Sequence, residues 1–253
     1  DMQIVNGGQT TASIYNARKD KKINADLSKV FVQMKISVIT SLEDLDEIVP
    51  RISAFANTQN KVQMADFSAN DPYHRRIEEL SRTIWAPAQG GSLPQNWFYE
   101  RARGQYADML ARESTTLRRK KYKEQHPLFT KTDLAKYENT WDQLPFYVSE
   151  GAQKNFRRFT IRISQQKGKL PDERYYHNLI AKAIMFRRTE KLVSQQQYGG
   201  YRANIVTYTL AFLSYKTAQR IDLERIWKTQ ALTEALEKEI VEVSRFIQQT
   251  IVN

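Results

Sequence analysis

From residue 97 onward the chain carries a nearly continuous succession of apolar residues at helical spacing. Apolar side chains that recur every three or four positions line one face of an α-helix. Thr132-Asp133 and Ser149-Glu150 are polar pairs of the kind that begin helices. Helices are predicted near residues 97–112, 132–141, 148–165, 172–196, 203–216 and 233–251. The pattern therefore predicts a helical part that spans residues 97–253.

The residues before position 86 mix strand and helix signals. Residues 30–39 alternate apolar and polar side chains and are rich in β-branched residues, which is typical of a strand. Ile4-Val5 indicates the end of a buried strand. Asp71-Pro72 resembles an N-cap followed by a first-turn proline, so a helix is expected there.

Residues 86–96, with two prolines and two glycines, are typical of a loop and mark a candidate boundary between domains. The expected fold class is therefore α+β and mainly helical. A small N-terminal α/β part (1–86) is followed by the helical part (97–253). The chain opens with Asp1 rather than Met, so the N-terminal part is expected to be truncated.

The first candidate site is a glycine-rich turn after Ile4-Val5. Two adjacent glycines let the backbone turn tightly, and a threonine would cap the following helix, whose N-terminus favours an anion. A second amide-rich junction at 57–60 could contribute side chains, although turn chemistry alone also explains both clusters. The residues expected to hold a phosphate are Asn6, Gly7, Gly8, Gln9, Thr10, Thr11, Asn57, Gln59 and Asn60.

The net charge of +11 indicates an anionic partner, with nucleic acid ahead of a membrane surface. Solubility alone explains such a charge equally well. No apolar run is long enough to span a bilayer, and the chain has no cysteine, which fits a reducing cytoplasm. Nucleic acid or nucleotide is therefore the expected partner. The protein is expected to be cytoplasmic and not to associate with a membrane. A phage or defence-system protein and a second copy of the chain are further candidates.

Two segments combine basic residues in patterns that suit nucleic acid. Aromatic residues interleaved with arginines at 97–106 suit base stacking and phosphate contacts, and residues 151–171 carry basic side chains opposite an apolar face. The basic run at 118–123 adds a third patch. A core helix or a solvated face would explain these patterns as well. The residues expected to contact nucleic acid are Tyr99, Arg101, Arg103, Lys154, Arg158 and Arg162.

The motifs of common enzyme classes are absent. No lysine follows the glycine pair as in a P-loop, and the three histidines lack metal-site spacing. A nuclease or nucleotide hydrolase would need scattered carboxylates such as Asp66, Asp71 and Glu100, whose spacing shows no motif. Whether the protein is an enzyme, its catalytic residues and its cofactors stay open, and no metal site is predicted.

Six segments follow one another along the chain: IVNGGQTT (4–11), ANTQNKV (56–62), NDP (70–72), FYERARGQY (98–106), FTKTDLAKY (129–137) and VSEGAQKNF (148–156). Taken together and in this order, they resemble the abortive-infection phage-resistance (AIPR) family. The resemblance implies a bacterial or phage-associated cytosolic protein of antiviral defence.

The opening turn is also distantly similar to the Asp-Gly-Gln-His-Arg turn of ParB-like and DNA-modification-associated domains. In ParB-like proteins this turn holds nucleotide phosphates. Thr10-Thr11 replace the His-Arg pair here, so the charged contact is absent. The leading hypothesis is a phage-defence protein that binds nucleic acid or nucleotide phosphate. A nuclease or nucleotide hydrolase, and a protein-interaction sensor, are the alternatives.

Overall fold

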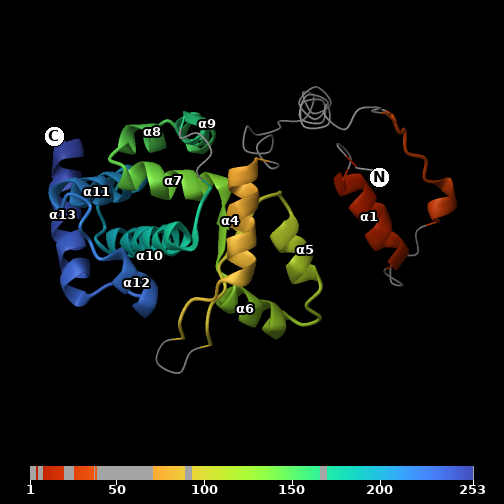
Figure 1. Ribbon diagram of the computed structural model, residues 1–253, viewed down its shortest axis with the longest axis horizontal. Helices are drawn as coiled ribbons and strands as arrows, with labels where there is room; N and C mark the ends of the chain where they lie inside the picture. The colour runs from red at the N-terminus through yellow and green to blue at the C-terminus, as the bar shows by residue number, and fades with distance from the viewer. Residues whose placement is uncertain are drawn as a thin grey trace. The chain divides into compact units, whose positions relative to one another are not determined.

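The computed structural model describes residues 4, 8–19, 26–36, 38, 71–88, 93–165 and 170–252. The chain divides into two compact units, Asp1–Gln63 and Met64–Asn253 (Figure 1). This division differs from the expected boundary between residues 86 and 97. The helix that begins at Pro72 packs against the strand Phe98–Glu100 and so belongs with the helices that follow it.

Unit Asp1–Gln63 contains helix α1 (Gly8–Lys19) and the short 3-10 helix η1 (Leu27–Lys29). Asp26 begins η1, because its carboxylate accepts a hydrogen bond from the backbone N–H of Ser28. Helix α1 starts at Gly8, so Thr10 and Thr11 lie inside its first turn, and the expectation that either caps it is wrong.

The strand expected at 30–39 is not present at residues 30–36 or 38, the part of it that the structure describes. Phe31, Ile36 and Val38 are exposed there, and Ile4 is half exposed rather than buried. Alternation favours a strand, but a strand needs a hydrogen-bonded partner and a covered face, and no described residue supplies either.

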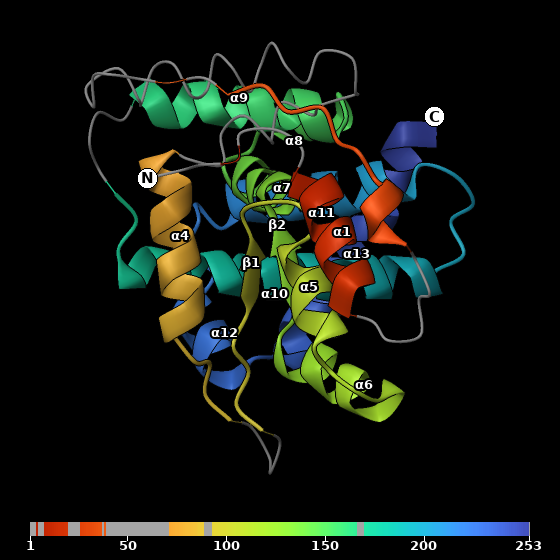
Figure 2. The same ribbon diagram turned by 90° about the vertical axis from the view of Figure 1, so that its right-hand side faces the viewer.

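Unit Met64–Asn253 is a helical assembly around one small sheet (Figures 1 and 2). Its elements in chain order are α4 (Pro72–Thr83), β1 (Phe98–Glu100), α5 (Gln105–Ala111), α6 (Thr116–Gln125), β2 (Leu128–Thr130), α7 (Lys131–Trp141), α8 (Pro145–Ser149), α9 (Ala152–Gln165), α10 (Glu173–Gln195), α11 (Arg202–Lys216), α12 (Leu223–Thr229) and α13 (Glu234–Val252).

The single helix expected at 97–112 is wrong, because this range holds strand β1 and helix α5. Strands β1 and β2 pair in parallel, with Tyr99 opposite Phe129, and α5 and α6 form the crossover that a parallel pair requires. The aromatic residues at 97–99 have high strand propensity. Gly104, at φ +95°, takes a left-handed backbone conformation immediately before α5 begins, so a continuous helix cannot run through this position.

Helix α7 lies between α9 and α10 (Figures 1 and 2). It begins with a capping box, in which Thr130 and Asp133 exchange side-chain and backbone hydrogen bonds. The true N-cap is therefore Thr130, two residues before the expected Thr132. The helix expected at 148–165 is split into α8 and α9, because Gly151 between them has φ +97°.

The core is centred on α10, which contacts α4, α7, α11, α12 and α13. Tyr176, Leu179 and Ile180 are fully buried on it, and Asp172 caps its first turn. A second apolar cluster joins α10, α11 and α13 around Ile240. The fold is therefore α+β and mainly helical, as predicted. None of the described helices combines the length and apolar content that crossing a bilayer requires.

Candidate functional site

Helix α4 presents a charged face to solvent on one side and an apolar face to the core on the other. His74, Ile77 and Leu80 are buried at helical spacing. The helix begins as the sequence indicates, since the carboxylate of Asp71 accepts a 2.8 Å hydrogen bond from the N–H of Tyr73. The intervening positions carry arginines and glutamates, which therefore point away from the core.

The turn after β1 is held by hydrogen bonds from its own side chains. Glu100 accepts the backbone N–H groups of Gly104 and Tyr106, both at 3.2 Å. The side-chain oxygen of Gln105 accepts the N–H groups of Arg101 and Ala102 at 3.1 and 2.9 Å. This network fixes the backbone from which Arg101 extends, so the side chain starts from a rigid position.

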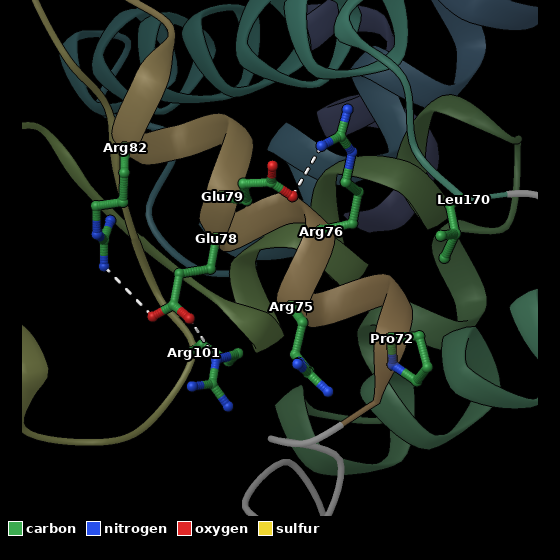
Figure 3. A pocket seen from close by; sticks show the side chains of 8 residues that line it. All are labelled: Pro72, Arg75, Arg76, Glu78, Glu79, Arg82, Arg101 and Leu170. Atoms are coloured by element: carbon green, nitrogen blue, oxygen red, sulfur yellow. Dashed lines mark hydrogen bonds and ion pairs between the residues drawn. The ribbon is translucent and has the colours of Figure 1, made fainter.

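The charged face of α4 and this turn form an open pocket of about 510 Å³. Its lining residues are Pro72, Arg75, Arg76, Glu78, Glu79, Arg82, Arg101 and Leu170 (Figure 3). Four arginines face two glutamates, so the lining carries an excess of two positive charges. We call it the arginine pocket. Its charge suits a phosphate group.

Glu78 organises the arginine pocket. It accepts hydrogen bonds from Nε of Arg101 at 2.5 Å and from the side-chain amide of Gln105 at 2.8 Å, and Arg82 lies 3.6 Å away. Glu79 pairs with Arg76 at 2.8 Å. Arg75 has no acidic partner among the described residues and extends to the same side of α4 as Arg101 (Figure 3).

Helix α6 has the highest density of positive charge among the described helices. It carries five cationic side chains, one glutamate and no buried residue, and Thr115 caps it through the N–H of Arg118. None of the cationic side chains forms an ion pair with another described residue. The five are Arg118, Arg119, Lys120, Lys121 and Lys123.

A buried polar cluster lies beneath α4. Nδ1 of His74 is 2.7 Å from the hydroxyl of Tyr99, and the His74 ring also contacts Phe156. Its Nε2 has no hydrogen-bond partner among the described residues. Burial, followed by the charges of Lys131 and Arg101, lowers the pKa of His74 to about 3, so the ring is neutral at physiological pH.

The expected nucleic-acid contacts at 97–106 separate into buried and accessible positions. Tyr99 is fully buried against His74 and Phe129, so its ring cannot stack on a base, and this expectation is wrong. Arg101 is partly buried and lines the arginine pocket, and Arg103 is exposed. The segment therefore offers its arginines, and not its aromatic rings, to a ligand.

The expected basic stripe on α9 is partly neutralised. Arg158 pairs with Glu150 at 3.3 Å, and Arg162 pairs with Asp142. Lys154 is exposed. Fewer charges of this stripe are available to a phosphate than the sequence alone indicates.

Most of the opening-turn site lies outside the described residues. Gly8, Thr10 and Thr11 are in the first turn of α1, where Gly8 and Thr10 are exposed. A Cβ built on Gly8 meets nothing within 4 Å. The members that the structure does not describe are Asn6, Gly7, Asn57, Gln59, Asn60 and the side chain of Gln9.

The carboxylates considered for a metal-dependent hydrolase have structural partners. Asp71 caps α4, and Glu100 holds the turn after β1. Asp66 lies outside the described residues. The described part of the chain contains no cluster of three His, Cys, Asp or Glu side chains placed to hold a metal ion.

Three arginines of the pocket were not predicted from the sequence. They are Arg75, Arg76 and Arg82, which all lie on α4. Arg75 and Arg82 are seven positions apart, or about two helical turns, and this spacing is the signal that could have found them. Arg101 lies nearly twenty positions further on, and only the packing of α4 against β1 brings it to them.

Comparison with known proteins identifies the family of this chain. The model of the family described as "AIPR protein" matches residues 1–253, which is the whole chain. No curated protein and no solved structure matches. The family match agrees with the resemblance carried by the six sequence segments and connects the chain to abortive infection and phage resistance. The chain belongs to the AIPR family.

Proposed function

We propose that this AIPR protein acts in phage defence by binding nucleic acid, with α6 and the arginine pocket as its phosphate contacts. The observation that carries the proposal is α6 itself. Five cationic side chains stand exposed on ten residues, and none forms an ion pair with another described residue. Cationic groups without such partners can exchange their counterions for phosphates, which is the main source of affinity for a nucleic acid.

Helix α6 and helix α4, which carries most of the lining of the arginine pocket, lie at the same end of unit Met64–Asn253 (Figure 1). The guanidinium of Arg82 lies 3.6 Å from the ring of Phe98, and ring contacts of 5.0 Å from Phe98 to Tyr106 and 5.9 Å from Tyr106 to Tyr122 connect it to α6. A phosphate backbone that contacts α6 can therefore reach the arginine pocket. Solubility alone would not require the positive charge to gather in one place.

The other expected phosphate contacts remain part of the proposal with smaller roles. Replacing Lys154, Arg158 and Arg162 by Gln should weaken binding less than changes in α6, because both of these arginines are ion-paired. The turn before α1 remains a proposed phosphate seat. Gly8→Val tests it, since a Cβ at this position meets nothing within 4 Å among the described residues outside its own helix and would obstruct a ligand there.

The test compares two triple variants of equal charge. The first is Arg118→Gln, Lys120→Gln and Lys121→Gln on α6. The matched control is Arg245→Gln, Lys191→Gln and Lys238→Gln, three exposed residues on α13 and the last turns of α10. Helix α13 lies at the far end of the unit from α6 (Figure 1).

Binding of a fluorescent oligonucleotide is measured by anisotropy at low salt. Three exposed charge contacts of about 0.5–1 kcal/mol each predict roughly 10- to 100-fold weaker binding for the α6 variant. The control should stay within about threefold of the parent, the effect of net charge alone. Equal affinities for the two variants would refute the proposed role of α6.

A further inference from the structure

A row of aromatic rings lies beside the basic residues of α6. The ring of Trp85 is 5.8 Å from that of His126, and His126 is 4.3 Å from Tyr122. Tyr122 is in turn 5.9 Å from Tyr106. Tyr122 lies on α6 and His126 is its C-cap, so the row adjoins the helix with the densest positive charge in the described chain.

Trp85 stands out among the tryptophans. Its side chain is 48% exposed, whereas Trp97, Trp141 and Trp227 are all buried. A large exposed aromatic ring beside a cationic surface has the two properties that single-stranded nucleic-acid sites combine, a face for a base and charge for the backbone.

Asn96 fixes the segment of Trp85 relative to His126, the next ring of the row. Its side-chain amide donates to the carbonyl of Ile84 at 2.8 Å, and its backbone N–H donates to the carbonyl of Gln125 at 2.9 Å. Its own carbonyl accepts from Nδ1 of His126 at 3.1 Å. One buried residue thus holds the segment before Trp85 against the end of α6.

Cationic groups border this row. Arg118 and Arg119 precede Tyr122 by one helical turn, so they lie on the same side of α6 as its ring. The guanidinium of Arg82 lies 3.6 Å from the ring of Phe98, which is itself 5.0 Å from the ring of Tyr106 in the row. Burial lowers the pKa of His126, so its ring is neutral near pH 7 and supplies a surface rather than a charge.

We infer that this surface binds single-stranded nucleic acid, with a base stacked on Trp85 and the adjoining phosphates on α6. The inference rests on the proposed function and names its substrate class. Bases in a duplex stack on one another and do not offer their faces, whereas an unpaired strand does. A helix of ten residues is about 15 Å long, so its charges suit a strand rather than one nucleotide.

The test uses the fluorescence of Trp85. Parent, Trp85→Phe and Trp85→Ala are titrated with a single-stranded oligonucleotide, with the duplex of the same sequence and with a mononucleotide. Phe246→Ala, an exposed aromatic residue on α13, is the matched control. Circular dichroism verifies that each variant is folded.

The parent should bind the single strand most tightly, and binding should quench a fluorescence component that Trp85→Phe lacks. Trp85→Ala should bind the single strand about 5- to 150-fold more weakly, with no change for the duplex, and Phe246→Ala should match the parent. If Trp85→Ala is unfolded, the quenching comparison between the parent and Trp85→Phe decides.

The failures of the two proposals are distinguishable. Salt-sensitive binding with equal quenching in parent and Trp85→Phe would overturn the stacking inference and leave the proposed function standing. Equal affinity for the single strand and the duplex, or for the single strand and the mononucleotide, would also overturn the inference. Absence of binding to every oligonucleotide would overturn both.

Discussion

Glu78 shows how single residues shape the arginine pocket. Its carboxylate joins Arg82 of its own helix to Arg101 of the turn after β1, and it is mostly buried. It therefore holds the arginines in position and at the same time cancels part of their charge. The carboxylate of Glu78 therefore stabilises the fold and lowers the affinity of the pocket for an anion.

Replacement of Glu78 by Gln separates the two effects. We expect the free energy of unfolding to fall by about 1–3 kcal/mol, because hydrogen bonds to a charged group are lost. Binding of an oligonucleotide at low salt should become tighter, since the pocket gains one positive charge. Urea unfolding measures the first effect, and fluorescence anisotropy measures the second.

Glu79→Gln is the matched control, because it adds the same charge to the pocket. Its ion pair with Arg76 is exposed, so the cost in stability should stay below about 1 kcal/mol. If both folded variants bind with the affinity of the parent, phosphate does not enter the arginine pocket.

The buried ring of His74 should make the free energy of unfolding depend on pH. Its pKa in the folded protein is about 3, well below the ordinary value, because burial disfavours the charged ring. The unfolded chain therefore takes up a proton that the folded protein does not, and stability is lost as the pH falls from about 6.5 towards 3. The slope is at most about 1.4 kcal/mol per pH unit.

Thermal unfolding of the parent and His74→Gln between pH 7 and pH 5 isolates this contribution. The difference in stability between them should shrink as the pH falls, because only the parent carries this titrating ring. The other histidines and the carboxylates are common to both proteins. A difference that stays constant over this range would mean that His74 is not buried as a neutral ring.

At the scale of elements, α9 shows what periodicity predicts well. Phe156 and Phe159 are buried on one face, as the sequence predicts, and Lys154 and Arg158 are exposed on another. Its basic face was predicted, but the ion pairs of Arg158 and Arg162 were not. Their acidic partners come from the end of α7 and from the α8–α9 junction, and only packing brings them near.

Phe159→Ala tests this element. Truncation of a fully buried phenylalanine typically costs about 3–5 kcal/mol. Ile161→Ala on the same helix is the control, since Ile161 is half exposed and its loss should cost well under 1 kcal/mol, roughly the range of surface substitutions. Urea denaturation of both variants measures the difference. Equal stability of the two variants would mean that the faces of α9 are assigned wrongly.

The short elements could not be predicted from local patterns. Strands β1 and β2 have three residues each and pair positions thirty residues apart, so no periodic pattern in the sequence predicts them. Helix α6 has hardly any apolar residues, and its sequence indicated a basic patch but no helix. The alternation at 30–39 favoured a strand, although pairing depends on a partner that the pattern does not name.

At the scale of the whole molecule, the net charge of +11 indicated an anionic partner without saying where it binds. Among the described residues, exposed charge without ion-pair partners gathers on α6, and the arginine pocket carries an excess of two positive charges. Arg101 was predicted as a contact. The row of rings that begins at Trp85 was not, because tertiary hydrogen bonds of Asn96 bring the segment of Trp85 to the end of α6.

The salt dependence of binding tests the central claim most directly. The association constant for a single-stranded oligonucleotide is measured over a range of salt concentrations for the parent and the two triple variants. Each phosphate contact contributes about 0.7 to the slope of log K against log salt for a single strand. The α6 variant should therefore have a slope smaller by about 2, and the α13 and α10 control should keep the slope of the parent. An unchanged slope in a folded α6 variant would contradict the account.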